Sequence, residues 1–438
     1  MICNRPLTPP EMADSQRNYL LYNGVNGASY MCLGETVLIL FAVKLHAPDT
    51  VVAILGGMIF FGFLLLPLGK VMTARRGAAV TQADCWVYRN IAALIVAAAA
   101  PVSLFVSPAF AAVLLVVGAF LFYGFRAAGV VMSYPLVGEI CPKDKLGAFV
   151  AKAWIYFYSS GVLALLAITL CMRFNSSVWM LFAIIIAGTL LGVTSSTYVR
   201  KIHETGTIPE NARRPLLKEI PRIIRNKVII RQLVAGMICN MSTVFLVPIS
   251  MLTLKRGYAV DDSTALLYSL VQFAASIGTS VVLVKLADRF GGRKVAIAGF
   301  YGNYIIAALW LLLPFSFNPV LAILPFIFTP CCAVASSTAL TQYFIRTVPP
   351  REQVTASMLI ALGTGVLAGL PGMILSGAFL KIAAMLNTTA QAMMTYKYYF
   401  LFIICLLPIM SIAVHALYKE DKLPQAETAE TAETSASS

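Results

Sequence analysis

Charge is scarce in this chain, because Asp, Glu, Lys and Arg together make up 12% of its 438 residues. Soluble domains average about 25%. Neither a C-x-x-C pair nor Cys and His at the spacing of a zinc site occurs among its nine cysteines and three histidines. The sequence also lacks the G-x-x-x-x-G-K-[ST] phosphate loop. We therefore expect no metal site, no cofactor and no ATP-driven step.

Long apolar runs take the place of charge, with 59% hydrophobic residues and a mean hydropathy of +0.82. A run of about 20 residues is long enough to cross about 30 Å of hydrocarbon as a helix. The sequence predicts twelve such spans, at residues 19–43, 51–71, 88–106, 109–132, 147–172, 178–199, 232–254, 263–286, 295–314, 320–344, 354–380 and 398–417.

Basic residues are unevenly divided between the loops that join these spans. Of the 33 Lys and Arg residues, all but six fall on one side of the predicted membrane; the six are Lys44, Arg173, Lys255, Arg256, Lys381 and Lys397. Short cytoplasmic loops retain basic residues, so both termini are expected in the cytoplasm. The short termini and compact loops favour the inner membrane of a bacterial cell. We interpret the net charge of +14 as this topology signal plus attraction to anionic lipid, and expect no nucleic-acid binding.

The only long loop, residues 200–231, divides the chain into bundles at 19–199 and 232–418, between a cytoplasmic segment at 1–18 and a disordered tail at 419–438. Within the loop, five apolar residues recur at helical spacing and predict an amphipathic interfacial helix kinked at Pro221. The five are Leu216, Leu217, Ile220, Ile223 and Ile224. A membrane-surface strut is the preferred interpretation of this helix, and a regulatory or partner-binding role is the alternative.

Matching turns in the two bundles indicate a repeat, since the basic glycine turn at 69–77 corresponds to 284–292. The segment LADRFGGRK at 286–294 resembles the loop signature G-x-L-A-D-R-x-G-R-[RK] of the major facilitator superfamily. Asp288, Arg289, Gly291 and Arg293 occupy its characteristic positions. Thr73 replaces the Asp in the first copy. Arg126 and Gly129 resemble the R-x-x-x-G element of the same family, although two residues and not three lie between them.

This resemblance covers residues 19–418 and implies an all-α membrane fold of twelve helices in two pseudo-symmetric six-helix bundles. It also implies a monomeric, non-enzymatic carrier of a small organic solute. In such folds the solute site lies between the halves, near mid-membrane.

Polar residues inside the spans are the candidates for that site. Glu35 is the one acidic residue well inside a span, where a charge is costly; it is either a proton carrier or a protonated carboxyl bonded to a neighbouring helix. A polar layer in the inner half of the membrane is predicted from Asn23, Asn26, Arg126, Tyr156 and Asn240, and a stripe on the eighth span includes Tyr268 and Gln272. Interhelical hydrogen bonding is the alternative for each stripe.

Two further points remain open from the sequence. Asn26 and Glu35 could face one cavity only if the first span bends, for which Gly24 and Gly27 are the candidate positions. In the eleventh span, six residues between 363 and 377 are Gly or Pro, which fits either close packing or a hinge.

The favoured function is proton-coupled transport of a polar solute, such as a sugar or an organic acid, by alternating access. A non-transporting sensor or scaffold on the same fold is the alternative. A polytopic membrane enzyme is less favoured, because the external loops are short and poor in catalytic groups.

Overall fold

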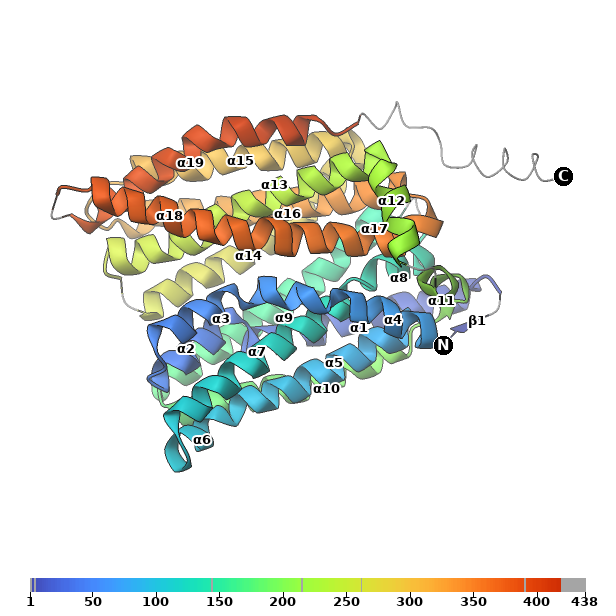
Figure 1. The fold of residues 1–438 in the computed structure, drawn as a ribbon, viewed down its shortest axis with the longest axis horizontal. Helices are drawn as coiled ribbons and strands as arrows, with labels where there is room; N and C mark the ends of the chain where they lie inside the picture. Colours follow the sequence, from blue (N-terminus) through green and yellow to red (C-terminus); the bar gives the residue numbers. More distant parts are fainter. Residues whose placement is uncertain are drawn as a thin grey trace.

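The fold is a bundle of long helices whose axes are roughly aligned. The computed structural model describes residues 2–3, 5–142, 145–213, 216–260, 262–389 and 391–418. In Figure 1 the N-terminal half lies below and the C-terminal half above, with the helices of both halves running along the long axis. The predicted tail at 419–438 lies outside the described residues. The all-α fold in two helical halves is confirmed.

Within its described residues, the first half contains β1 (Ile2–Cys3) and ten α-helices. The helices are α1 (Pro9–Leu33), α2 (Glu35–Lys44), α3 (Asp49–Gly62), α4 (Leu66–Arg76), α5 (Ala78–Ala97), α6 (Ala99–Phe105), α7 (Pro108–Val130), α8 (Ser133–Ile140), α9 (Leu146–Phe174) and α10 (Val178–Arg200). The 3-10 turn η1 (Phe63–Leu65) joins α3 to α4.

The linker holds β2 (Glu204–Thr205), α11 (Thr207–Arg213) and α12 (Leu216–Arg225). The second half contains α13 (Lys227–Leu252), α14 (Asp262–Phe290), α15 (Gly292–Leu312), α16 (Pro319–Thr347), α17 (Pro350–Leu362), α18 (Leu370–Leu386) and α19 (Ala392–His415). Two π-helical segments interrupt this half, η2 (Thr253–Gly257) and η3 (Gly363–Gly369).

The predicted spans all fall on helices, several of them built from two consecutive elements. Within the described residues, eleven helical stretches are long and apolar enough to cross a membrane. The predicted span at 263–286 falls in α14, a helix of 29 residues, part of whose side chains lie outside the described set. The eleven qualifying stretches agree approximately with the predicted twelve, and α14 lies at the remaining predicted span.

The first span is broken at a position that the sequence did not indicate. Gly24 and Gly27 both lie inside the continuous helix α1. The interruption is at Gly34, whose extended backbone (φ −70°, ψ 171°) separates α1 from α2. Gly27 instead permits close packing, because a Cβ there would lie 2.1 Å from the carbonyl oxygen of Phe157 in α9. The interruption of this span therefore lies at Gly34 and not at the candidate positions Gly24 and Gly27.

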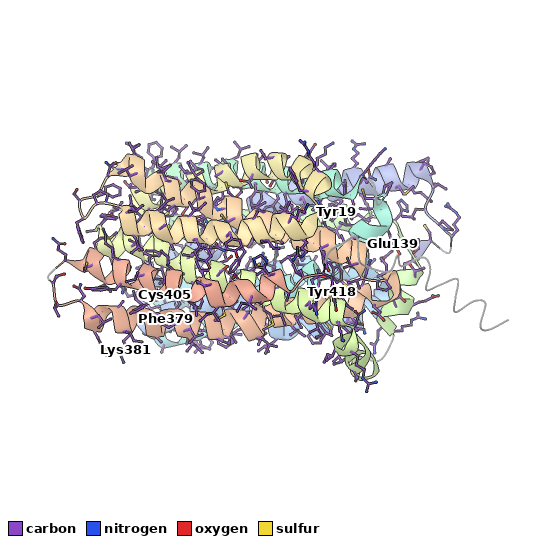
Figure 2. The ribbon with its side chains drawn as sticks, turned by 90° about the horizontal axis from the view of Figure 1, so that it is seen from above. Tyr19, Glu139, Phe379, Lys381, Cys405 and Tyr418 are labelled. Atoms are coloured by element: carbon purple, nitrogen blue, oxygen red, sulfur yellow. The ribbon has the colours of Figure 1, made fainter. Side chains whose placement is uncertain are left out.

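Turns between helices gather basic residues at one end of the stack, which we call the basic end; it carries Arg75, Arg76, Arg200, Arg213 and Arg293. Glu139 and Tyr418 lie toward this end, and Lys381 lies at the other (Figure 2). The halves are packed together at the basic end, where one apolar cluster contains Ile140 of the first half with Phe344, Val348 and Ala356 of the second. Access between the halves is therefore closed there.

The linker is folded onto the basic end of the first half. Strand β2 pairs with β1 in parallel, and the buried carboxylate of Glu204 accepts hydrogen bonds from the backbone N–H groups of Ala78 (2.7 Å) and Ala79 (3.2 Å). These groups open α5, so Glu204 caps that helix from a distant segment. Burial raises the pKa of Glu204 to about 7.

Helix α12 lies in the loop where the sequence predicts an amphipathic helix, and Pro221 lies inside it. Ile223 is buried and Ile224 is exposed. The side chains of Leu216 and Leu217 lie outside the described set.

Candidate functional site

A cavity of about 420 Å³ lies between the two halves. Helices α7 and α9 of the first half form one wall, and α13, α16, α17 and η3 of the second half form the other. Its polar lining includes Tyr158, Gln232, Asn240, Thr243, Ser336, Ser337, Thr341 and Thr364. This volume falls within the usual range for small-molecule pockets.

A smaller cavity of about 150 Å³ adjoins the first on the side of the N-terminal half. Aromatic and amide side chains dominate its wall, among them Tyr22, Asn23, Asn26, Tyr30 and Trp86. Arg126, Val130 and Thr341 line both cavities. The two spaces therefore meet at Arg126.

Arg126 is the one Lys, Arg, Asp or Glu among the described residues that line either cavity. Its guanidinium carbon lies 4.8 Å from the centre of the Tyr30 ring. A guanidinium over the face of an aromatic ring is attracted by the ring's negative face. Tyr30 therefore holds Arg126 at the junction of the cavities.

Asn26 belongs to a packed polar layer in the wall of the smaller cavity. Its side-chain oxygen accepts a hydrogen bond of 2.9 Å from the Trp86 indole N–H. Nearby, the Gln82 amide donates to the Tyr22 hydroxyl (3.1 Å) and to Ser133 (2.9 Å). These bonds fix the aromatic wall, since a buried polar group without a partner is costly.

Asn23 also faces the smaller cavity, and its amide donates to the backbone oxygen of Tyr19 at 2.8 Å. Asn240 faces the larger cavity, and its amide donates to the backbone oxygen of Thr364 in η3. Within η3, a Cβ at Gly365 or Gly369 would lie 2.4 or 2.1 Å from the ring of Phe63 or Phe60. Gly365 and Gly369 therefore serve close packing against the first half, in an irregular helix that Asn240 contacts.

Three predicted residues are not among those that line the two cavities. Tyr268 is buried, and its hydroxyl donates to the backbone oxygen of Pro319 at 2.8 Å. Tyr156 is 40% exposed on α9. The backbone oxygen of Gln272 accepts from Ser276, and Thr279 bonds Ala275. Of these contacts on α14, the bond of Tyr268 to Pro319 joins two helices, whereas those of Ser276 and Thr279 lie within the helix.

Glu35 is the first residue of α2, directly after the break at Gly34. Its side chain lies outside the described set, as does that of Asp288. In the loop signature, Gly291 has a φ of +81° and precedes α15. Arg293 donates to the backbone oxygens of Leu417 (2.7 Å) and His415 (3.0 Å) at the end of α19, and Arg289 is exposed.

The first copy of this turn has its own left-handed glycine, Gly77, with a φ of +85°. Gly77 and Gly291 are offset by 214 residues, one fewer than the offset taken from the sequence. Ala74 and not Thr73 then corresponds to Asp288, so the first copy lacks the Asp under either correspondence.

Sequence reasoning missed several cavity residues. The run Ser336, Ser337 and Thr341 lies on α16, and its density of small hydroxyl residues inside an apolar span was the available signal. It also counted Arg89 among the basic-side residues, whereas Arg89 is fully buried in α5. The Arg89 guanidinium carbon lies 4.7 Å from the Trp86 ring centre, and one of its nitrogens is 3.4 Å from the Ser29 hydroxyl.

A possible metal-ligand group lies at the basic end, where Cys3, Glu11 and His203 bring one ligand atom each within 4.8 Å of one another. The Glu11 carboxylate is already held by Arg5 at 2.9 Å and by Thr8 at 2.8 Å. These contacts compete with any ion.

The sequence model of the Major Facilitator Superfamily matches residues 20–373. Among solved structures, the proton:xylose symporter XylE has a TM-score of 0.67 at 13% identity, over 96% of this chain and 97% of its own; another structure of XylE is described as from E. coli. A bacterial homologue of the iron transporter ferroportin has a TM-score of 0.68 at 12% identity, over 92% of this chain and 98% of its own. The nucleoside transporter NupG has a TM-score of 0.63 at 13% identity, over 92% and 100%. The search of curated proteins found no match.

Proposed function

The chain belongs to the major facilitator superfamily, and from this premise we propose that it is a secondary transporter that moves a small polar organic solute by alternating access. The observation that carries the proposal is the cavity of about 420 Å³ whose walls come from both halves. A site at the interface of two repeats can open to either side when the halves rock. The family and the structural relatives point to a transporter and not to an enzyme.

The proposed cycle alternates the packing at the two ends of the stack. The apolar cluster at the basic end separates when the cavity opens there, and contacts such as the one between Tyr158 of α9 and Phe273 of α14, whose ring centres are 6.2 Å apart, lie along the other part of the interface. The basic end faces the cytoplasm in this proposal, because Lys and Arg are retained there. Both termini are then cytoplasmic, and the protein acts as a monomer in the inner membrane of a bacterium.

Proton coupling through Glu35 is the proposed source of energy. The support is its position, at the start of the half-helix α2 after a break within a span. Transporters of this kind place ion and substrate groups at interrupted helices. Replacing Glu35 by Gln should abolish accumulation driven by a proton gradient while leaving exchange of solute intact, and unchanged accumulation would contradict the coupling.

Transport itself is tested with the purified protein in proteoliposomes and a panel of radiolabelled sugars and organic acids. We expect uptake of at least one solute, and its loss when Ser337→Trp fills the cavity. Thr194→Trp is the matched control, because Thr194 is exposed on α10 and outside both cavities. A sensor or scaffold would show no uptake with any solute, including one that it binds.

A further inference from the structure

We propose that the transported solute is a small organic acid whose single carboxylate binds Arg126 at the junction of the two cavities. This inference rests on the proposed function and names the solute class for the same site. Its starting observation is that a lone cation stands between two cavities whose described lining contains no acidic side chain.

The charge of Arg126 is not balanced by any acid among the described residues. The ion pairs found there join Arg5 to Glu11, and both Arg76 and Arg200 to Asp84. Asp84 thus pairs with two arginines near the basic end, whereas the described contact of Arg126 is the ring of Tyr30 at 4.8 Å. A charged side chain within a membrane span is costly without a partner or water. An anion entering the cavity supplies that partner.

Arg89 adds a second positive charge on the same side of the site. It is fully buried behind Trp86, which lines the smaller cavity. Its Nε and one terminal nitrogen have no hydrogen-bond partner among the described residues. Two guanidinium groups without an adjacent described acid make the field of this wall positive, which attracts anions and repels cations.

The number of positively charged side chains that reach the cavities indicates how many carboxylates the solute carries. Arg126 reaches the cavities, while Arg89 is sealed behind the indole of Trp86, so one guanidinium is available for direct contact. A guanidinium binds a carboxylate through two parallel hydrogen bonds. The remainder of the solute meets hydroxyl and amide groups, such as Ser337, Thr341 and Asn240. A hydroxylated monocarboxylate satisfies both parts of the site.

The test compares solutes that differ only in the carboxylate, using thermal shift and calorimetry on the purified wild-type protein. Suitable pairs are gluconate with sorbitol, lactate with propane-1,2-diol, and nicotinate with nicotinamide; glycerol 3-phosphate with glycerol adds a phosphate arm. We expect at least one carboxylate to stabilise the protein and its neutral counterpart to bind about tenfold or more weakly. Equal binding of the neutral members, stronger binding of the phosphate ester, or no stabilising carboxylate would overturn the inference.

Variants assign the effect to Arg126. Arg126→Gln should remove the preference for the acid, and Arg126→Lys should retain part of it, because the charge stays while the paired hydrogen bonds are lost. Arg256→Gln, which removes an exposed charge outside both cavities, should change nothing. If Arg126→Gln does not fold, the inference is tested by Arg126→Lys and by the paired acid and neutral solutes on the wild-type protein. Uptake of a neutral solute that survives in Arg126→Gln would refute the anion assignment and leave the transport function standing; absence of any uptake would refute transport.

Discussion

Lys70 of α4 and Thr355 of α17 are hydrogen-bonded across the boundary between the two halves, with 2.7 Å between Nζ and Oγ1. Both side chains are buried. The contact lies at the basic end, beside the apolar cluster that joins the halves there. It is a polar link between elements that must separate if the cavity is to open at this end.

Replacing Lys70 by Met should favour the conformation that is open at the basic end. A hydrogen bond to a charged group contributes about 1.5–3 kcal/mol, so its loss should shift the equilibrium by about tenfold or more. Spin labels are attached to Arg75→Cys and Lys294→Cys on a background without native cysteines. The distance between them, measured by double electron–electron resonance, reports how far the two halves separate at the basic end. We expect a longer-distance population to grow.

Lys201→Met is the control, since Lys201 is an exposed lysine at the same end, just after α10. If the longer-distance population grows equally in Lys201→Met, or if the distance distribution is unchanged in Lys70→Met, then Lys70 does not help to keep this end closed.

Gly27→Ala should destabilise the first half by about 1–3 kcal/mol, the usual range for overpacking. Its Cβ would meet the backbone oxygen of Phe157 at 2.1 Å, and a backbone atom cannot move away as a flexible side chain can. Thermal unfolding in detergent measures the effect. Gly278→Ala is the matched control, because a Cβ at that helical position meets nothing within 4 Å; equal stability of the two variants would contradict the close contact of α1 with α9.

Glu204 should make the protein less stable as pH rises from about 4.5 to about 7. Its pKa is about 7 in the folded protein, against an ordinary value of 4.5. Between these values the unfolded chain loses the proton while the folded protein keeps it, so the free energy of unfolding falls with rising pH. The melting temperature should therefore fall as the pH rises across this range, because of Glu204.

Glu204→Gln should flatten that pH dependence, since a neutral amide can still accept from the Ala78 N–H. Glu210→Gln, at an exposed site on α11, should keep the wild-type profile. A wild-type profile in Glu204→Gln would show that other groups control stability in this window.

The sequence predicted the spans and the two halves because hydropathy records how much of each segment lies in lipid or protein interior. It could not fix the rotation of each helix, since neighbouring residues point about 100° apart and small shifts change which side chain meets the cavity. Tyr156 was assigned to the site from its depth in the membrane and Tyr268 from its place in a polar stripe; in the structure Tyr268 bonds Pro319 and Tyr156 lies at an exposed surface. Asn23, Asn26, Arg126 and Asn240 do line the cavities.

Contacts between distant segments were also beyond the sequence pattern. The capping of α5 by Glu204 depends on where the linker folds back, and the break at Gly34 depends on how α1 and α2 pack, since one glycine in an apolar run fits a continuous helix equally well. Arg89 looked like a residue of the basic side because distance along a span says little about burial within the bundle.

The most direct test of the account is whether one position in the large cavity can be reached from both sides of the membrane. Ser337→Cys, on a background without native cysteines, places a thiol on the lining of that cavity. In vesicles of known orientation, a membrane-impermeant thiol reagent should label it from either side, and a bound carboxylate solute should slow the labelling. Labelling from one side only, under conditions in which solute is exchanged, would contradict alternating access through this cavity.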